Sequence, residues 1–170
     1  MKLEFVCQAG CQLPAGTRAA LVAVAARLAP APLVVHVVTA RDGLLRRLNE
    51  EYRGQARTTD VLAFRYESGA RGRGGAAAPR HGPDAEVYVS LDRTVVQARE
   101  HGHSRGREFV RLVLHGLLHL QGHDHHSGPE ACRMRAAETR ALRWLAGRYP
   151  RLATTGLVPP GRRVARNSGR

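Results

Sequence analysis

The sequence predicts an α+β fold in which a small mixed sheet of four strands packs with about five helices, and in which a metal site lies on one helix and the turn after it. Strand-like segments alternate with helical segments over roughly the first 100 residues, and only helical segments follow. The helical segment at residues 104–121 is apolar on every side but one, which is typical of a buried helix. A chain of 170 residues is long enough to bury a core as one domain.

Four segments have the patterns of β-strands. Residues 2–8 alternate between apolar and polar side chains, whereas residues 32–39 form a β-branched run that suits a buried strand. His36 in that run is interpreted as a core histidine with a hydrogen-bond partner. Residues 59–64 and 86–90 are the third and fourth predicted strands.

Helical patterns predict five helices, and several of them have a start or stop signal at an end. Pro30 closes the first helix, Asp42 is a candidate N-cap of the second, and Gly122 offers the left-handed backbone that ends the fourth. The predicted helices span residues 13–28, 42–52, 91–101, 104–121 and 129–148.

We expect a single domain over residues 1–150. Within it, residues 67–84 contain five glycines and two prolines, a composition that predicts a flexible basic loop. Residues 151–170 contain five arginines and no acidic residue, and we expect a disordered basic tail there.

The sequence favours a cytoplasmic protein. No apolar run approaches the ~18 residues of a membrane-spanning helix. Residues 1–7 include an acid and a strand-like pattern in place of the basic patch and long apolar core of a signal peptide. Cys7, Cys11 and Cys132 are odd in number and fit reduced thiols.

The charge balance favours a polyanionic partner. The net charge is +13, from 27 basic and 14 acidic residues, and all but one of the basic residues are arginines. RNA or DNA is the first candidate, because phosphate backbones attract such an excess of positive charge. Four Tyr, three Phe and one Trp argue against a broad surface for base stacking.

The run of residues 115–125 predicts a metal site. His115 and His119 are four residues apart, so on a helix their imidazoles lie on one face, one turn apart. Because Gly122 lets the chain fold back, His125 can supply a third nitrogen. Three histidines leave the fourth position of a tetrahedral zinc ion open for water, as in catalytic sites. We expect one zinc ion per chain, although imidazole also suits other divalent ions.

Chance clustering is the alternative, since the chain contains nine histidines. The helix pattern argues against it, because a single polar face on an apolar helix must meet a cleft or partner groups. That face consists of Ser104, Glu108, Arg111, His115 and His119. Asp124 is interpreted as orienting a ligand or capping the next turn, and His123 as contacting a ligand or being exposed.

The histidine spacing is also that of the metzincin peptidases, which carry glutamate directly after the first histidine as general base. Here that position is Gly116, which cannot transfer a proton. Either another group supplies the base, or the chemistry uses a metal-bound hydroxide, whose parent water has a pKa near ~7. A peptidase is therefore the weaker alternative among metal-dependent hydrolases.

A second segment combines an arginine with a turn. Arg53 follows the predicted helix 42–52, and Asp60 lies at the start of the predicted strand 59–64. Arginine is a natural bidentate partner of phosphate oxygens. From the residues alone, a solvated surface role for Arg53 is the default.

These motifs resemble those of the YbeY family, bacterial rRNA maturation factors regarded as single-strand-specific endoribonucleases. Residues 115–125 (HGLLHLQGHDH) resemble the family's signature. Asn49, Tyr52-Arg53 and residues 59–62 (TDVL) resemble its second motif. The resemblance covers roughly residues 1–148.

The resemblance implies that His115, His119 and His125 bind zinc and that Arg53 is functionally important. It implies a small mixed sheet with helices and a positively charged cleft over the metal. It also implies 16S rRNA 3′-end maturation and ribosome quality control in the cytoplasm. The implied partners are ribosomal RNA, the small ribosomal subunit, one of its proteins and an assembly GTPase, with no membrane.

The chain departs from the family pattern outside the three histidines. Thr58, Ala63 and Arg65 replace a proline, a serine and a proline of the second motif. The family's fourth strand usually opens Gly-Asp-Ile, and the corresponding run here places Glu86 at the aspartate. Asp60 and Glu86 are accordingly kept as candidate members of the site.

Our hypothesis from the sequence is phosphodiester hydrolysis, in which zinc on the three histidines activates a water and Arg53 holds the phosphate. The main alternative is a non-enzymatic ribosome-assembly factor whose metal only stabilises the fold. A metallopeptidase fits less well, because of Gly116 and the high positive charge.

Overall fold

The computed structural model describes residues 1–28, 33–66, 82–123 and 128–153. Within these residues, a four-stranded mixed sheet and five α-helices confirm the predicted α+β fold. The strands are β1 (Lys2–Cys7), β2 (Val34–Ala40), β3 (Val61–Arg65) and β4 (Ala85–Ser90). The helices are α1 (Ala15–Leu28), α2 (Asp42–Arg53), α3 (Leu91–Glu100), α4 (Arg105–Leu120), α5 (Gly128–Arg148) and the 3₁₀-helix η1 (Pro150–Ala153).

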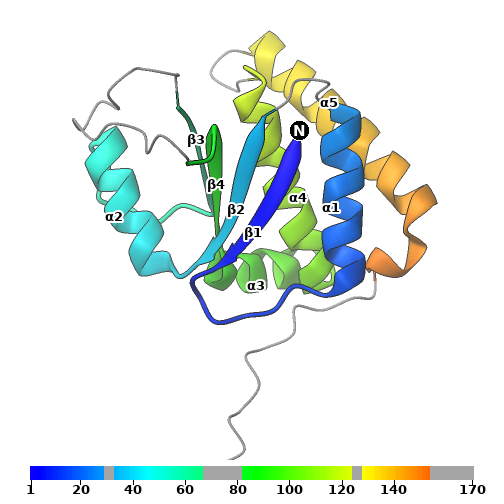
Figure 1. The fold of residues 1–170 in the computed structure, drawn as a ribbon, viewed down its shortest axis with the longest axis horizontal. Helices are drawn as coiled ribbons and strands as arrows, with labels where there is room; N and C mark the ends of the chain where they lie inside the picture. The colour runs from blue at the N-terminus through cyan, green and yellow to red at the C-terminus, as the bar shows by residue number, and fades with distance from the viewer. Residues whose placement is uncertain (29–32, 67–81, 124–127, 154–170) are drawn as a thin grey trace, which may run out of the picture.

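The sheet has the strand order β1-β2-β4-β3, with β2 and β4 in the centre. Strands β1, β2 and β4 are parallel, whereas β3 runs antiparallel to β4. Helix α2 lies on one face of the sheet and α1 and α4 lie on the other, with α5 packed against α4 and α1 (Figure 1). Helix α4 is therefore a middle layer between the sheet and α5.

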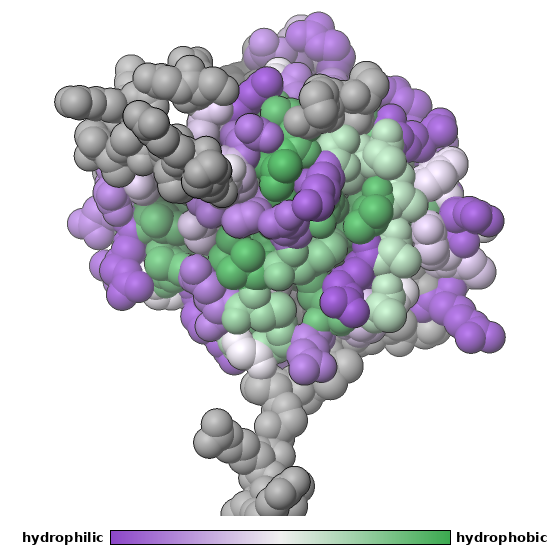
Figure 2. Space-filling model, viewed as in Figure 1, coloured by the Kyte–Doolittle hydropathy of each residue, from purple (hydrophilic) through white to green (hydrophobic). Residues whose placement is uncertain are grey.

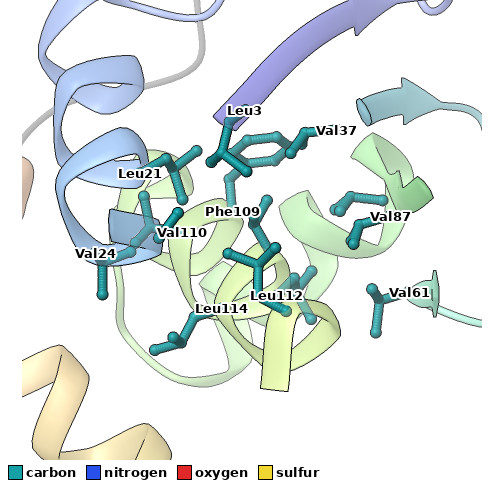
Figure 3. Close-up of a cluster of buried hydrophobic side chains, with 14 of the residues drawn as sticks. Leu3, Leu21, Val24, Val37, Val61, Val87, Phe109, Val110, Leu112 and Leu114 are labelled. Atoms are coloured by element: carbon teal, nitrogen blue, oxygen red, sulfur yellow. The ribbon is translucent and has the colours of Figure 1, made fainter. Parts of the chain in front are cut away.

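The larger apolar cluster lies between the sheet and α4. Alternate residues of a strand point to opposite faces, so every second strand residue enters this cluster. Figure 3 shows Val61 and Val87 of the sheet in one cluster with Phe109 and Leu112 of α4. A smaller cluster under α2 is built on Ala40, Leu45 and Leu62. The tight packing of α4 against the sheet leaves little freedom for the residues along it.

Two local expectations differ from the structure. Asp42 is not the N-cap of α2, because the cap residue is Arg41 and the N–H of Asp42 donates to Oδ2 of Asp92 at 3.0 Å. A carboxylate from α3 thus accepts a hydrogen bond from a backbone N–H in the first turn of α2. His36 has the expected partner, Glu4, at 3.1 Å, but it is only partly buried.

The division into a domain of residues 1–150 and a tail stays a prediction. Residues 151–153 belong to η1, whereas residues 154–170 lie outside the described residues, as do residues 67–81 of the predicted loop. No helix in the described part of the chain combines the length and the apolar character needed to cross a membrane. The face in Figure 2 has hydrophobic residues near its centre, with hydrophilic residues among them and around its rim.

Candidate functional site

Helix α4 has the single accessible stripe that its sequence predicts. Between residues 108 and 120 the partly exposed residues are Arg111, His115 and His119, and all the others are buried. The buried positions pack against the sheet, α1, α3 and α5. The core therefore fixes which way the two histidines point.

Gly122 ends this helix region as predicted, with φ of 83°. The N–H of Gly122 donates to the carbonyl of His119 at 2.9 Å, and the N–H of His123 donates to that of Leu118 at 3.1 Å. These two bonds form a Schellman motif, which turns the chain away from the helix axis. Asp124 and His125 follow outside the described residues, so their predicted roles stay predictions.

His115 and His119 lie side by side, one turn apart. Their Nε2 atoms are 3.2 Å apart, and their ring centroids are 4.8 Å apart. Two nitrogen ligands of a tetrahedral zinc ion, each about 2.0–2.1 Å from the metal, are separated by about 3.3 Å. The two imidazoles therefore fit one ion.

Glu138 of α5 faces His115 from the outer layer. Its Oε1 lies 3.5 Å from Nδ1 of His115 and 3.8 Å from Nη1 of Arg111. A carboxylate in this position fixes the tautomer and the orientation of a metal-binding histidine. Glu138 was not predicted from the sequence, although it falls in the apolar stripe of α5, four residues after the buried Met134.

Gly116 faces the sheet. A Cβ atom at this position would lie 2.5 Å from Cγ1 of Val87 and 3.2 Å from Cγ2 of Val61. Both distances are below the ~3.5 Å at which carbon atoms pack. Side chains of the sheet thus occupy the space that a metzincin glutamate would need, and no carboxylate fits after the first histidine.

Arg53 and Asp60 line one polar cavity of about 350 Å³ beside the C-terminal end of α2. The lining of this cavity also includes Asn49, Arg57, Arg93 and Gln97. Asn49 holds the loop against α2 by donating from Nδ2 to the carbonyl of Arg57 at 2.9 Å. Three arginines and one aspartate line the cavity, a charge balance that suits an anion.

A chain of polar contacts connects this cavity to the histidine pair. Gln97 of α3 donates to Oδ2 of Asp60 at 3.0 Å and accepts from Nη2 of Arg111 at 3.1 Å. Arg111 also lies beside Glu138, which faces His115. The other carboxylate oxygen of Asp60 accepts from its neighbour's N–H at 2.9 Å, so both oxygens support the framework around the cavity.

A second group of possible metal ligands lies in the turn before α4 and in the first turn of that helix. One ring nitrogen each of His101 and His103 and one carboxylate oxygen of Glu108 all lie within 4.8 Å of one another. Burial raises the pKa of Glu108, but the hydrogen bonds and charge of Arg111 more than offset this and hold the pKa below its ordinary value. This group was not predicted from the sequence, because its histidines lie in the turn before α4 and follow no ligand motif.

Arg65 and Glu86, two of the departures from the family pattern, hold neighbouring elements together. Nη1 of Arg65 donates to the carbonyl of Leu120 at 3.2 Å, and a cation is favourable at this end of a helix. Oε2 of Glu86 accepts from the hydroxyls of Tyr66 at 2.6 Å and Tyr88 at 2.9 Å. Burial, together with this carboxylate, raises the pKa of both tyrosines.

A family model and curated relatives of this chain carry the same family description. The model of the family described as Endoribonuclease YbeY matches residues 15–146. The endoribonuclease YbeY of Roseiflexus castenholzii is 42% identical over 112 residues, which are 65% of this chain and 69% of that protein. The endoribonuclease YbeY of Chloroflexus aurantiacus is 40% identical over 126 residues, which are 74% of this chain and 81% of that protein.

A solved structure supports the fold. The solution structure of TM1509 from Thermotoga maritima aligns with 95% of this chain and 99% of its own, with a TM-score of 0.57. The two sequences are 21% identical, so this likeness concerns the arrangement of strands and helices.

Proposed function

The chain belongs to the endoribonuclease YbeY family, and from this premise we propose that it is a metal-dependent endoribonuclease that hydrolyses phosphodiester bonds of single-stranded RNA. The observation that carries the proposal is the convergence of His115 and His119 on the accessible stripe of α4. We further propose that the substrate is ribosomal RNA, with a role in 16S 3′-end maturation and ribosome quality control in the cytoplasm. The net charge of +13 supports an RNA substrate.

In this proposal His115, His119 and His125 hold one zinc ion. The 3.2 Å separation of the Nε2 atoms of His115 and His119 suits two ligands of one tetrahedral ion. When bound, zinc supplies Lewis acidity, which polarises a phosphoryl oxygen and lowers the pKa of a water. Gly116 has no part in the chemistry, because its position faces the sheet.

Glu138 orients His115 in this mechanism. The carboxylate lies 3.5 Å from Nδ1 of His115, and its negative charge favours the tautomer with the proton on Nδ1, which would leave the lone pair on Nε2 for a metal ion. The guanidinium of Arg111 lies 3.8 Å from the same carboxylate oxygen and forms a second charge contact with it. Arg111 also donates to Gln97, a residue of the cavity lining, so this contact connects the histidine pair with the arginine-lined cavity.

The arginines of the cavity bind the RNA backbone in this mechanism. Arg53 holds the phosphate through two nitrogens and offsets the negative charge that develops on its oxygens during hydrolysis. Arg57 and Arg93 contact neighbouring phosphates. Binding through several arginines should weaken steeply as the salt concentration rises.

The test is cleavage of a single-stranded 16S rRNA fragment by the purified full chain. Three samples are compared: the wild type, the His119→Ala variant, and wild type treated with a chelator and then given zinc. The same fragment annealed to its complement is the control for strand preference. We expect cleavage of the single strand that is lost in the variant and after chelation and that returns with zinc.

Other outcomes would contradict the proposal. Cleavage that is the same in all samples would identify a contaminating ribonuclease. Absence of cleavage with intact RNA binding would favour the alternative, a non-enzymatic factor that docks on the small ribosomal subunit. Hydrolysis of casein that depends on His119 would instead favour the metallopeptidase.

A further inference from the structure

The corner between α3 and α4 places two histidines against a buried carboxylate. Glu108 is fully buried, His103 is partly exposed and His101 is exposed. Nδ1 of His103 lies 3.2 Å from Oε2 of Glu108, and Nδ1 of His101 lies 3.5 Å from the same oxygen. Both imidazoles thus approach one atom from the accessible side.

These distances suit three ligands of one transition-metal ion. Ligands at about 2.0–2.2 Å from a tetrahedral zinc ion are about 3.3–3.6 Å apart, close to the two nitrogen–oxygen distances at this corner. The two ring nitrogens lie no more than 4.8 Å from each other. His101 can close this gap by a side-chain rotation, because its side chain is 46% exposed.

The two oxygens of Glu108 have different neighbours: Arg111 binds Oε1, whereas the imidazoles approach Oε2, which is hydrogen-bonded to His103 and is the candidate ligand atom. Oε1 accepts from Nε of Arg111 at 2.8 Å and from Nη2 at 2.6 Å. The backbone holds the corner in place, since the N–H of His103 donates to the carbonyl of Ala98 at 2.8 Å and Ser104 caps α4. A ligating carboxylate is commonly fixed by such a hydrogen bond to its second oxygen.

We propose that His101, His103 and Glu108 form a second metal site, which binds a zinc-like divalent ion independently of the histidine pair. Imidazole nitrogens with a carboxylate oxygen are a ligand set that zinc accepts, and three protein ligands leave one position for water or a phosphate oxygen. The ion fastens the turn before α4 to the helix and, through Glu108, fixes Arg111.

The second site is separate from the first. Glu108 and His115 are seven residues apart on α4, which corresponds to about 10.5 Å along the helix axis. Two ions that act on one phosphate lie about 3.5–4 Å apart, so the two sites do not form a binuclear centre. Each site should fill and empty on its own.

The test is the number of zinc ions bound per chain after equilibrium dialysis of chelator-treated, full-length protein at a series of free zinc concentrations. The wild type is compared with the double variants His101→Ala/His103→Ala and His115→Ala/His119→Ala. His36→Ala is the matched control, because His36 is also a partly buried histidine hydrogen-bonded to a glutamate. Circular dichroism checks that each variant is folded.

We expect two ions in the wild type and in the control, and one ion in each double variant. The inference is overturned if His101→Ala/His103→Ala binds as much zinc as the wild type at every concentration. Loss of all zinc in His115→Ala/His119→Ala alone would also overturn it, while leaving the proposed function in place. If His115→Ala/His119→Ala kept all its zinc and His101→Ala/His103→Ala lost its zinc, the result would support the second site and contradict the first.

Discussion

Replacing Gly116 by alanine would force a methyl group against the sheet beneath α4. The new Cβ would lie 2.5 Å from Cγ1 of Val87, about 1 Å short of a normal carbon–carbon contact. Val87 is fully buried in the central strand β4, and its branched side chain has few alternative rotamers. The contact can therefore be relieved only by moving α4 or β4.

The expected cost follows from two opposing effects. Overpacking of a core costs about 1–3 kcal/mol, whereas the better helix propensity of alanine returns about 1 kcal/mol. We expect a net loss of up to about 2 kcal/mol in the free energy of unfolding, which lowers Tm by up to roughly 8 °C for a chain of this size. Thermal and urea unfolding of the metal-free protein measure both quantities.

Two companion variants make the result decisive. Gly147→Ala is the matched control, because Gly147 is also helical but a Cβ there meets nothing within 4 Å, so stability should stay the same or rise. Val87→Ala removes the methyl group that clashes, so in a double-mutant cycle it should compensate Gly116→Ala by about 1 kcal/mol. A Gly116→Ala protein as stable as the wild type, with no coupling to Val87, would refute this account of the packing.

Three further predictions concern the site and the fold. Arg53→Ala should reduce cleavage of RNA without releasing zinc, whereas Arg46→Ala on the same helix should have little effect; loss of zinc from Arg53→Ala would contradict its role. Glu138→Gln should weaken zinc binding about 10–100-fold in competition with a chelator, and an unchanged affinity would remove Glu138 from the mechanism. Burial raises the pKa of Asp92, but hydrogen bonds from the backbone of Asp42 and from Arg41 outweigh burial, so the net effect is a lowered pKa. The ionised Asp92 therefore stabilises the fold above the ordinary aspartate pKa, and this stabilisation is lost as the pH falls through the lowered pKa. The stability difference between wild type and Asp92→Asn should therefore shrink below about pH 4, and a difference that grows on acidification would reverse this assignment.

The sequence predicted what depends on local periodicity. The β-branched strand runs, the buried helix with one polar stripe and the left-handed Gly122 all arise from patterns within a single element, and the structure has each of them. The order of strand-like and helical segments also predicted the mixed sheet. The family resemblance singled out Arg53, which lines the polar cavity with Asp60.

Contacts between elements distant in the chain were not predictable in this way. Asp92 reaches α2 from 50 residues away, and Glu138 meets His115 only because α5 packs on α4. Each partner is an ordinary acidic residue when read along the chain. Its role depends on the packing of two helices, which periodicity does not specify.

The antiparallel pairing of β3 and β4 has a consequence for how this protein can diverge. The base of their hairpin is closed by the N–H of Tyr66, which donates to the carbonyl of Asp84 at 2.9 Å, and the adjacent Arg65 reaches the end of α4. Because these bonds hold the two strand ends, insertions between them leave the register of β3 and β4 unchanged. Doubling the length of such a connection costs only about 0.6 kcal/mol of loop-closure entropy. Changes in the length or charge of the sequence between Tyr66 and Asp84 can therefore leave the histidine pair of α4 and its supporting core the same.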